Sequence, residues 1–499
     1  MTTAGESTSV TLVHALRYAD DLLGVSGGTA GESVALLEYL LGICYASETC
    51  PSTVDDWIGW VVEGGPLPGA ADWLESRPDG HWDLFDREEP LGQNALLAPY
   101  LDVYGAGPAQ LVIEQAGDYN QFFDHHHLEH PAPLPADAAF RAMLTQHAYG
   151  PGGRARISGK ETLGPTLTNL AAGRLGTRIR VVALGKTLGD TLRLNLVPTD
   201  DAPGRFNRTW TKAPQPRRGF LTKPPGRRVD GAADLHTVLG RSILMRPAVA
   251  EDGTPAVDRV LLAAGELLEP LAAHQMQDAV YEVSNGTKKP LRPSASRALW
   301  REAHALYAAV ADRDHGPDLY DRLARLSGRR LNLWAVGLIA KQTAVLTWVS
   351  DTFPFVPGRE ADLRYAAERG SLVAEHVASC LSRAAFVAWT VTYPNPKPAD
   401  KSGQIARFDA SPEHWAHTAE PFHVLLAETA EAENEEQVDG ALVEYAVVIA
   451  EAAGRFLRHR LDSLPPNSRG FQARAQAIRR LESDLTGPKA PDELTGERK

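Results

Sequence analysis

A change in the hydrophobic pattern after Pro357 constrains the fold more than any other feature of this sequence. From there on, apolar residues recur at the spacing that forms one buried stripe along an amphipathic helix. Three such stripes are Val373, Val377, Cys380, Ala384 and Val387; Leu442, Tyr445, Ile449 and Phe456; and residues 471–485. Ser411-Pro412 has the composition of a further helix start. The pattern predicts a four-helix bundle over residues 346–486 and a flexible polar tail over residues 487–499.

The residues before the bundle mix helical and strand-like patterns. The strand-like runs are Leu111–Ile113 and Arg178–Val197. Gly189-Asp190 marks a turn within the second run, and the many Pro and Gly of residues 201–230 indicate a long irregular excursion. The sequence therefore predicts an α+β protein, in which a mixed α/β domain over residues 1–345 precedes the bundle.

The composition is that of a globular protein. The chain has 499 residues, 43% of them hydrophobic and 23% charged. Cys44, Cys50 and Cys380 form no CxxC pair, so neither a disulfide framework nor a cysteine zinc site is expected. No apolar stretch reaches the roughly 18 residues of a membrane span, and the first residues lack the apolar core of a signal peptide. We expect a cytoplasmic protein with no membrane partner and no cofactor.

Charge is strongly segregated along the chain, although the total is only −12. In residues 1–135, three Arg and no Lys stand against twenty-one acidic residues, a balance of −18. In residues 151–230, sixteen Lys and Arg stand against five acidic residues, a balance of +11. The second segment is either a surface that follows a phosphate backbone or a solvated basic loop, and charge alone does not decide between them.

The densest group of metal-binding side chains is Asp124-His125-His126-His127-Leu128-Glu129-His130. Adjacent histidines point in different directions on any regular element, and no HExxH spacing occurs. A solvated or phosphate-facing loop is therefore favoured over a metal-dependent hydrolase that uses Asp124, His126 and His130. No GxSxG elbow accompanies a nucleophile either, so no catalytic residue and no resident metal are predicted.

Two short segments have the composition of nucleic-acid contacts. Residues 149–154 contain Gly150, Gly152, Gly153 and Arg154 without the GK[ST] ending of a P-loop, so their backbone can approach another backbone closely. The strand-like residues 336–344 are interrupted by Lys341-Gln342-Thr343, which can form either a solvated turn or a wedge between bases. Spacing alone favours an ordinary connection and an ordinary turn.

Four motifs occur in a fixed order ahead of that turn and the bundle. They are Glu89-Pro90-Leu91-Gly92-Gln93, Gly117-Asp118-Tyr119-Asn120-Gln121-Phe122-Phe123, Leu192-Arg193-Leu194-Asn195-Leu196-Val197 and Thr209-Trp210-Thr211-Lys212-Ala213-Pro214. In this order the chain resembles, over nearly its whole length, the large subunit of the type I-E CRISPR Cascade surveillance complex, the CasA family.

The resemblance implies a non-catalytic subunit, one copy per complex, that recognises the protospacer-adjacent motif in duplex DNA and starts strand separation. It also implies the partners: the CRISPR RNA handle, target double-stranded DNA, the other Cascade subunits and a helicase-nuclease. RNA pairing reads the rest of the target in such a system. The family reads the motif largely from the minor groove, whose degenerate code suits tolerant recognition.

The resemblance also assigns site residues. For the DNA motif they are Gly150, Gly152, Gly153, Arg154, Lys341, Gln342 and Thr343, with Gln342 as the wedge. Arg259 stands in for the family's groove lysine, because residues 252–277 contain no Lys. The loop that contacts the RNA handle and neighbouring subunits carries Asn120, Phe123, His125 and His126. The displaced DNA strand is assigned to Arg469, Arg474, Arg479 and Arg480. A scaffold that holds the RNA handle without reading DNA is the remaining alternative.

Overall fold

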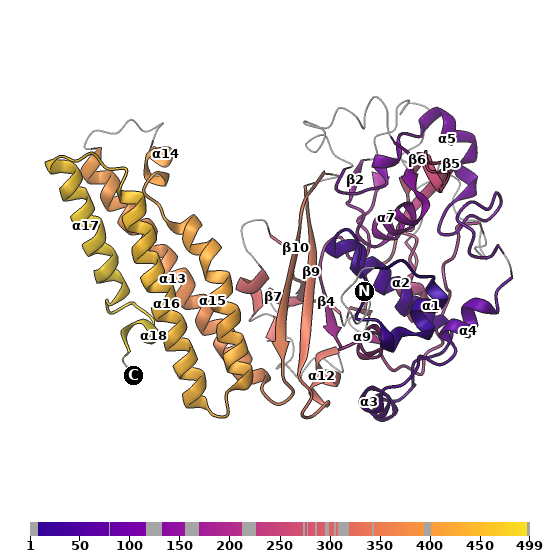
Figure 1. Cartoon of the computed structure of the whole chain (residues 1–499), viewed down its shortest axis with the longest axis horizontal. Helices are drawn as coiled ribbons and strands as arrows, with labels where there is room; N and C mark the ends of the chain where they lie inside the picture. The colour runs from indigo at the N-terminus through magenta and orange to yellow at the C-terminus, as the bar shows by residue number, and fades with distance from the viewer. Residues whose placement is uncertain are drawn as a thin grey trace. The chain divides into compact units, whose positions relative to one another are not determined.

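The computed structural model describes residues 8–78, 80–115, 132–154, 169–211, 226–272, 275–276, 278–284, 287–294, 299–303, 306–307, 319–341, 344–393 and 401–496. These residues divide into two compact units. Unit 1 takes those within Met1–Leu299 and Arg313–Thr352, and unit 2 takes those within Trp300–Asp312 and Phe353–Lys499. Unit 1 mixes helices with antiparallel sheets and unit 2 is helical, so the predicted α+β class is confirmed (Figure 1).

Helix α2 (Ala30–Ala46) forms the centre of unit 1. It begins at Thr29, whose hydroxyl accepts a hydrogen bond from the amide of Glu32. Most of its residues are buried on all sides, which is typical of a helix in a protein interior. It packs against α7 (Ala136–Tyr149) and α10 (Ala232–His236). Other helices within the described part of unit 1 are α1 (Leu12–Arg17), α3 (Val54–Glu63), α4 (Ala70–Glu75), α5 (Ala98–Tyr104), α9 (Leu188–Asn195) and α12 (Leu319–Ala324).

Two three-stranded sheets complete the framework of unit 1, in the orders β1-β6-β5 and β10-β9-β4. Their strands are β1 (Leu134–Pro135), β4 (Ile179–Leu184), β5 (Arg241–Val249), β6 (Pro255–Ala264), β9 (Leu331–Lys341) and β10 (Ala344–Phe355). Strands β5 and β6 are antiparallel, and their register shifts between Arg246 and Pro247 because proline has no amide for the ladder. Two shorter pairs are β2 (Gly153–Arg154) with β3 (Asn169–Leu170) and β7 (Tyr281–Ser284) with β8 (Thr287–Pro290).

The predicted strand over residues 178–197 is correct only in its first part. β4 ends at Leu184, and the Thr187 hydroxyl then accepts from the amide of Asp190 and starts α9. The side-chain amide of Asn195 exchanges hydrogen bonds with both backbone groups of Ala183, at 3.0 and 2.7 Å, and folds the helix back on the strand. Every residue of α9 is buried, polar residues included, and leucine alternates with polar residues over 192–196, which is the pattern of a strand.

The strand predicted at Leu111–Ile113 is also wrong. The chain turns there, directly after the short 3-10 helix Pro108–Gln110, and buries Leu111 and Ile113 in the core. Burial of isolated apolar residues in a turn produces the same short apolar run as a buried strand.

Residues of the sequence motifs hold β5 in place at its start and at its middle. The fully buried Gln93 accepts a hydrogen bond from the amide of Met245 at 2.8 Å and donates one to the carbonyl of Leu84 at 2.6 Å. The indole of Trp210 donates to the carbonyl of Arg241 at 3.0 Å. These motifs therefore contribute to the framework of unit 1, since buried polar groups of this kind are costly to leave unpaired.

Unit 2 is a bundle of α13 (Glu360–Thr392), α15 (Ser411–Glu431), α16 (Glu435–Leu461) and α17 (Ser468–Leu485), with the short α14 (Lys401–Ala406) and α18 (Asp492–Thr495). The predicted stripe of α13 faces the interior, where Val373 and Val377 are fully buried. Gly370 lets Phe422 and Leu425 of α15 approach closely, because a methyl group there would lie 2.8 Å from Leu425. The described helices of the chain include none long and apolar enough to cross a membrane.

The tail predicted to be flexible from residue 487 is instead ordered as far as residue 496. Helix α18 packs against α16, and the carboxylate of Glu493 pairs with the guanidinium of Arg369 at 2.6 and 2.7 Å. Glu493 is only 9% exposed. The sequence of this polar segment has no apolar stripe that would predict a packed helix. The ion pair that holds it joins residues far apart in the sequence, so it has no local sequence pattern.

Candidate nucleic-acid interface

The glycine segment lies directly after α7, which ends at Tyr149. The chain turns out of the helix at Gly150 and runs through Gly153 into the short β2–β3 pair, where Gly153 faces Leu170 and Arg154 faces Asn169. Gly150 is buried, Gly152 is partly exposed and Gly153 is exposed. We call residues 150–153 the glycine loop. Its inner end is part of the core, and its outer end presents backbone without side chains.

Close packing explains two of these glycines. A Cβ on Gly150 would lie 2.5 Å from the carbonyl of Gln146 and 2.6 Å from the guanidinium of Arg241. A Cβ on Gly152 would lie 3.2 Å from the amide of Ala172, a tight but smaller conflict. The carbonyl of Gly150 accepts from the amide of Gly173 at 2.8 Å. The loop base is thus fixed by backbone contacts that only glycine permits.

The predicted wedge lies at the turn of the β9–β10 hairpin. Lys341 ends β9 with an exposed side chain, Ala344 begins β10, and Gln342 and Thr343 lie outside the described residues. Both strands are long, and β9 is paired with β10 on one side and, over residues 332–337, with β4 on the other. In Figure 1 the turn end of this hairpin and strand β2 lie at the same end of unit 1.

An aromatic pair joins the glycine loop to the hairpin. The ring of Tyr149, next to Gly150, packs edge-on against Trp348 of β10. The indole of Trp348 also donates to the carboxylate of Glu114 at 2.5 Å. Sequence reasoning did not single out Trp348, because an aromatic residue in a strand gives no indication of its distant partner.

Arg259 has a structural partner. Its guanidinium donates to the carbonyls of Asp102 and Gly105, at 3.2 and 2.9 Å, and so satisfies the C-terminal end of α5. These contacts hold the side chain against its own unit. Its predicted role in the DNA groove stays a prediction that no described contact supports.

The described part of the basic segment 151–230 does not form one continuous basic surface. Several of its described arginines are ion-paired within unit 1, some with carboxylates of the acidic segment 1–135 and the others with carboxylates of residues 234–278. These pairs are Arg174 and Arg180 with Glu38 and Asp278, Arg193 with Asp20, Arg208 with Glu89, Arg227 with Asp234 and Glu266, and Arg228 with Glu269. Several cations of the described part of this segment are therefore neutralised by carboxylates that lie close to them in space.

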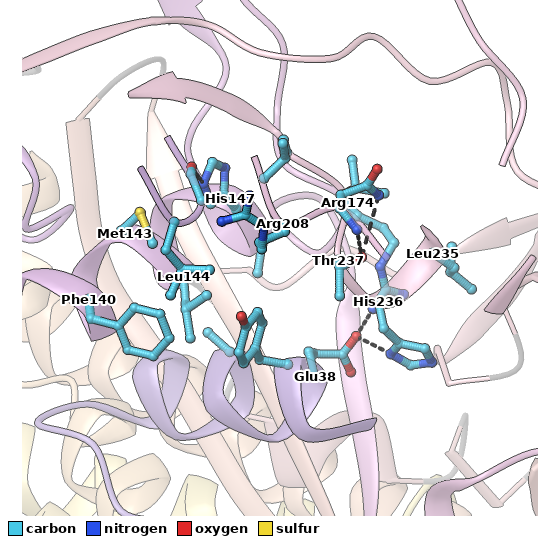
Figure 2. Close-up of a pocket in the computed structure, with 18 residues that line it drawn as sticks. Glu38, Phe140, Met143, Leu144, His147, Arg174, Arg208, Leu235, His236 and Thr237 are labelled. Carbon is cyan, nitrogen blue, oxygen red and sulfur yellow. Dashed lines mark hydrogen bonds and ion pairs between the residues drawn. The ribbon is translucent and has the colours of Figure 1, made fainter. Parts of the chain in front are cut away.

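Figure 2 shows the most deeply buried of these clusters, with Glu38 of α2 facing Arg174 and His236. The Glu38 carboxylate accepts from Arg180 Nε at 2.8 Å and from His236 Nδ1 at 2.8 Å, and it also pairs with Arg174. Burial and the neighbouring guanidiniums lower the pKa of His236 well below its usual value, so its ring is neutral. The cluster lines a small internal cavity of about 40 Å³ and is a structural element of the core.

The four arginines assigned to the displaced strand lie on α17 but differ in their contacts. Arg474 donates to the carbonyl of Leu461 and to Asp462, and Arg480 pairs with Asp484 at 2.9 Å. Arg469 and Arg479 are exposed, and within the described part of the chain neither has an ion-pair partner. Two cations of this helix are therefore available to a phosphate.

The predicted RNA-handle residues Asn120, Phe123, His125 and His126, and the hydrolase residues Asp124 and His130, lie outside the described residues. The backbone of Arg154 belongs to β2, while its side chain is also outside them. Among the residues that the structure does describe, no group of three or more His, Cys, Asp or Glu side chains is arranged to hold a metal ion.

Comparison with known proteins gives a consistent result. The family model described as CRISPR-associated protein Cse1 matches residues 1–479. A CasA/Cse1 protein of Thermus thermophilus is 28% identical over 375 residues, which cover 71% of this chain and 68% of that protein. The solved structure of Thermus thermophilus CasA (Cse1) superimposes with a TM-score of 0.75 at 20% identity, covering 97% of this chain and 96% of that one.

A chain in a solved CRISPR RNA-guided surveillance complex also has this fold. Its TM-score is 0.66 at 19% identity, and the match covers 96% of both chains. The α+β unit, the helical bundle and the family match together define a CRISPR-associated protein. More specifically, the chain belongs to the CRISPR-associated protein Cse1 family, also called CasA, as its motifs predicted.

Proposed function

We propose that this protein is the non-catalytic, DNA-reading subunit of a CRISPR RNA-guided surveillance complex in the cytoplasm. Its membership of the Cse1 family supports this, as does its likeness to a chain of such a complex. In this role it recognises the protospacer-adjacent motif in duplex DNA and starts strand separation, while the guide RNA reads the remaining sequence.

The observation that carries the proposal is the form of the glycine loop. Gly150 is locked into the core, whereas Gly152 and Gly153 become progressively exposed. A minor groove is narrow, so a protein segment without side chains can lie against its walls more closely than any other. Arg154, next in sequence, contributes a phosphate contact in this proposal.

The β9–β10 hairpin supplies the wedge. Two long paired strands support its turn, and the exposed Lys341 stands directly before Gln342 and Thr343. Gln342 enters the base stack and Lys341 contacts the backbone, because unstacking requires a rigid support that resists displacement. Motif reading and strand opening then occur at neighbouring segments of one unit.

The other partners bind elsewhere in this proposal. Residues 120–126, with Asn120, Phe123, His125 and His126, contact the CRISPR RNA handle and the other Cascade subunits, with one copy of this chain per complex. In unit 2, Arg469 and Arg479 bind the displaced strand, with Arg474 and Arg480 beside them, and the bundle helps to recruit the helicase-nuclease. The exposed positions of Arg469 and Arg479 support this part.

A competition gel shift at fixed salt tests the proposal. The remaining Cascade subunits with CRISPR RNA are mixed with target duplexes that carry an intact or a scrambled motif. This chain is omitted, added as wild type, or added as Gln342→Ala or Lys341→Ala. Lys489→Ala, an exposed lysine of unit 2, is the matched control for Lys341→Ala.

Only the wild-type chain and the Lys489→Ala control should confer full motif-dependent binding. Gln342→Ala should reduce motif dependence, and Lys341→Ala should weaken binding of all duplexes and lower the salt slope by about one. Motif dependence without this chain, or unaffected by it, would favour the scaffold role. Stoichiometric metal and an activity that are both lost in His126→Ala would favour the hydrolase.

A further inference from the structure

A buried arginine, Arg241, lies beneath the glycine loop and bridges its two ends. It is the first residue of β5 and is 1% exposed. Its Nη2 donates to the carbonyl of Pro151 at 2.8 Å, on the side where the chain leaves α7. Its Nη1 donates to the carbonyl of Ala171 at 2.6 Å, on the side where the chain returns from β3. One planar group thus connects both ends of the segment that contains the loop.

Arg241 differs from the buried Arg174 and Arg180 in its electrostatic surroundings. Arg174 and Arg180 are balanced by Glu38 and Asp278. The guanidinium of Arg241 instead donates only to backbone carbonyls, including that of Gly240 at 2.8 Å, and no carboxylate of the described residues pairs with it. Burial lowers its pKa to about 10, so it is a cation at neutral pH.

A buried cation without a carboxylate is expensive, and an apolar residue at this position would avoid the cost. The guanidinium offers in return a rigid planar fork with several donors, which can hold two chain segments at a fixed separation. The presence of an arginine at position 241 is therefore explained by the geometry of the guanidinium and not by its charge alone.

The surroundings of Arg241 are built to keep it in place. Its amide donates to Nδ1 of His147 at 3.2 Å, and Nε2 of the same ring donates to the carbonyl of Gly92 at 2.9 Å. Its carbonyl accepts from the Trp210 indole. Gly150 leaves room for its guanidinium, since a Cβ there would lie 2.6 Å from Nη2. Helix α7, the loop and β5 are therefore fixed relative to one another at one residue.

We infer that Arg241 is a positioning residue that holds the glycine loop in the conformation that reads the DNA motif. It touches no DNA itself and acts through Pro151 and Ala171. The inference rests on the proposed function of the loop and adds a residue that determines its specificity. Loss of the fork should change how well motifs are discriminated, whereas loss of a phosphate contact should weaken all duplexes alike.

The test compares Arg241→Lys with Arg193→Lys in the assembled complex. Lysine keeps the charge but cannot bridge two carbonyls with a planar fork. Arg193 is a matched control because it is also buried, pairs with Asp20 and lies on α9. The readout is the ratio of affinities for duplexes with intact and scrambled motifs, together with the salt slope of binding.

Arg241→Lys should lower this ratio about tenfold, comparable to one mismatched position in a site, with the salt slope unchanged. Arg193→Lys should keep the wild-type ratio. Gly150→Ala keeps Arg241 but crowds its guanidinium, so it should lower the ratio in the same way. This variant replaces Arg241→Lys in the test if the Arg241→Lys protein does not fold. Hydrogen exchange at the Gly173 amide should quicken in either loop variant.

Two results would overturn the inference. If the wild-type complex shows no motif dependence, the proposed function fails and the inference fails with it. If the wild type discriminates and both Arg241→Lys and Gly150→Ala discriminate equally well, the proposed function stands and only the role of Arg241 is wrong.

Discussion

The ring of Tyr149 meets the ring of Trp348 edge-on, with centroids 4.8 Å apart and an interplanar angle of 88°. Tyr149 ends α7 immediately before the glycine loop, and Trp348 lies on β10 of the hairpin. The pair brings together residues almost 200 positions apart in the sequence. Such T-shaped contacts contribute about 0.5–1.5 kcal/mol beyond burial, so the loop and the hairpin should respond together to changes at this contact.

Gly31→Ala should disturb this contact by displacing Trp348. A methyl group on Gly31 would overlap the ring of Trp348, so the indole must move, and overpacking of this kind costs about 1–3 kcal/mol. Gly59→Ala is the matched control, because Gly59 lies inside α3 and no atom lies near the position of an added Cβ. This substitution should stabilise the protein by about 0.5–1 kcal/mol, since alanine favours a helix more than glycine does. Denaturant unfolding measures the free energy of unfolding of both variants, and equal changes in the two would contradict the packing argument.

Glu38→Gln should destabilise unit 1 by about 3–5 kcal/mol, because it leaves buried Arg174 and Arg180 with one carboxylate fewer. Glu75→Gln removes a carboxylate from the solvent-exposed pair with Arg17 and should have a much smaller effect, since water screens that pair. The free energy of unfolding of the two variants gives the comparison. A Glu38→Gln chain as stable as Glu75→Gln would show that the buried cluster contributes little.

Stability should fall as the pH is lowered from about 6.5 to about 4. Burial lowers the pKa of His147 and of His414 to about 4 each, so the folded rings stay neutral while the unfolded rings take up protons below about 6.5. Each histidine should account for about 3 kcal/mol over this window, and below about pH 4 the effect should level off.

His414→Gln checks the assignment in unit 2. The histidine donates from Nε2 to the carbonyl of Ala374 at 2.9 Å, a bond that glutamine can replace without titrating. Unfolding monitored by helical circular dichroism from pH 4 to 7.5 should show a smaller pH dependence in the variant. An unchanged slope would mean that other groups cause the acid sensitivity.

The arginines of α17 should contribute unequally to binding of single-stranded DNA. Arg469→Ala with Arg479→Ala removes two exposed cations that have no ion-pair partner among the described residues, and should lower the salt slope by about 0.7 per lost contact. Arg474→Ala with Arg480→Ala removes cations that already pair with Asp462 and Asp484, and should have a smaller effect. Equal effects, or none, would contradict the proposed displaced-strand surface. Fluorescence anisotropy of a labelled oligonucleotide with the full chain measures both.

Parts of the candidate site could be read from the sequence. The glycines of residues 150–153 indicate a close approach of backbones, and the polar interruption at residues 341–343 indicates the turn of a hairpin. Arg241 and Trp348 could not be found in this way, since an arginine at a strand start and a tryptophan within a strand have no local signature of their partners. The same limit applies to Arg259, whose contacts with Asp102 and Gly105 exist only once α5 and β6 are packed.

The sequence by itself determined the elements whose signal is local. The helices of unit 2 follow from apolar residues at helical spacing, and the resemblance to the CasA family follows from the order of short motifs. Only the tertiary structure decided α9, whose alternation of leucine and polar residues over 192–196 imitates a strand, and the ion pairing of the basic segment. Its arginines look like a phosphate-binding surface along the chain, yet Glu38, Asp20 and Glu89 neutralise several of them from more than 100 positions away. Coulomb energy depends on distance in space, which a linear count of charges does not contain.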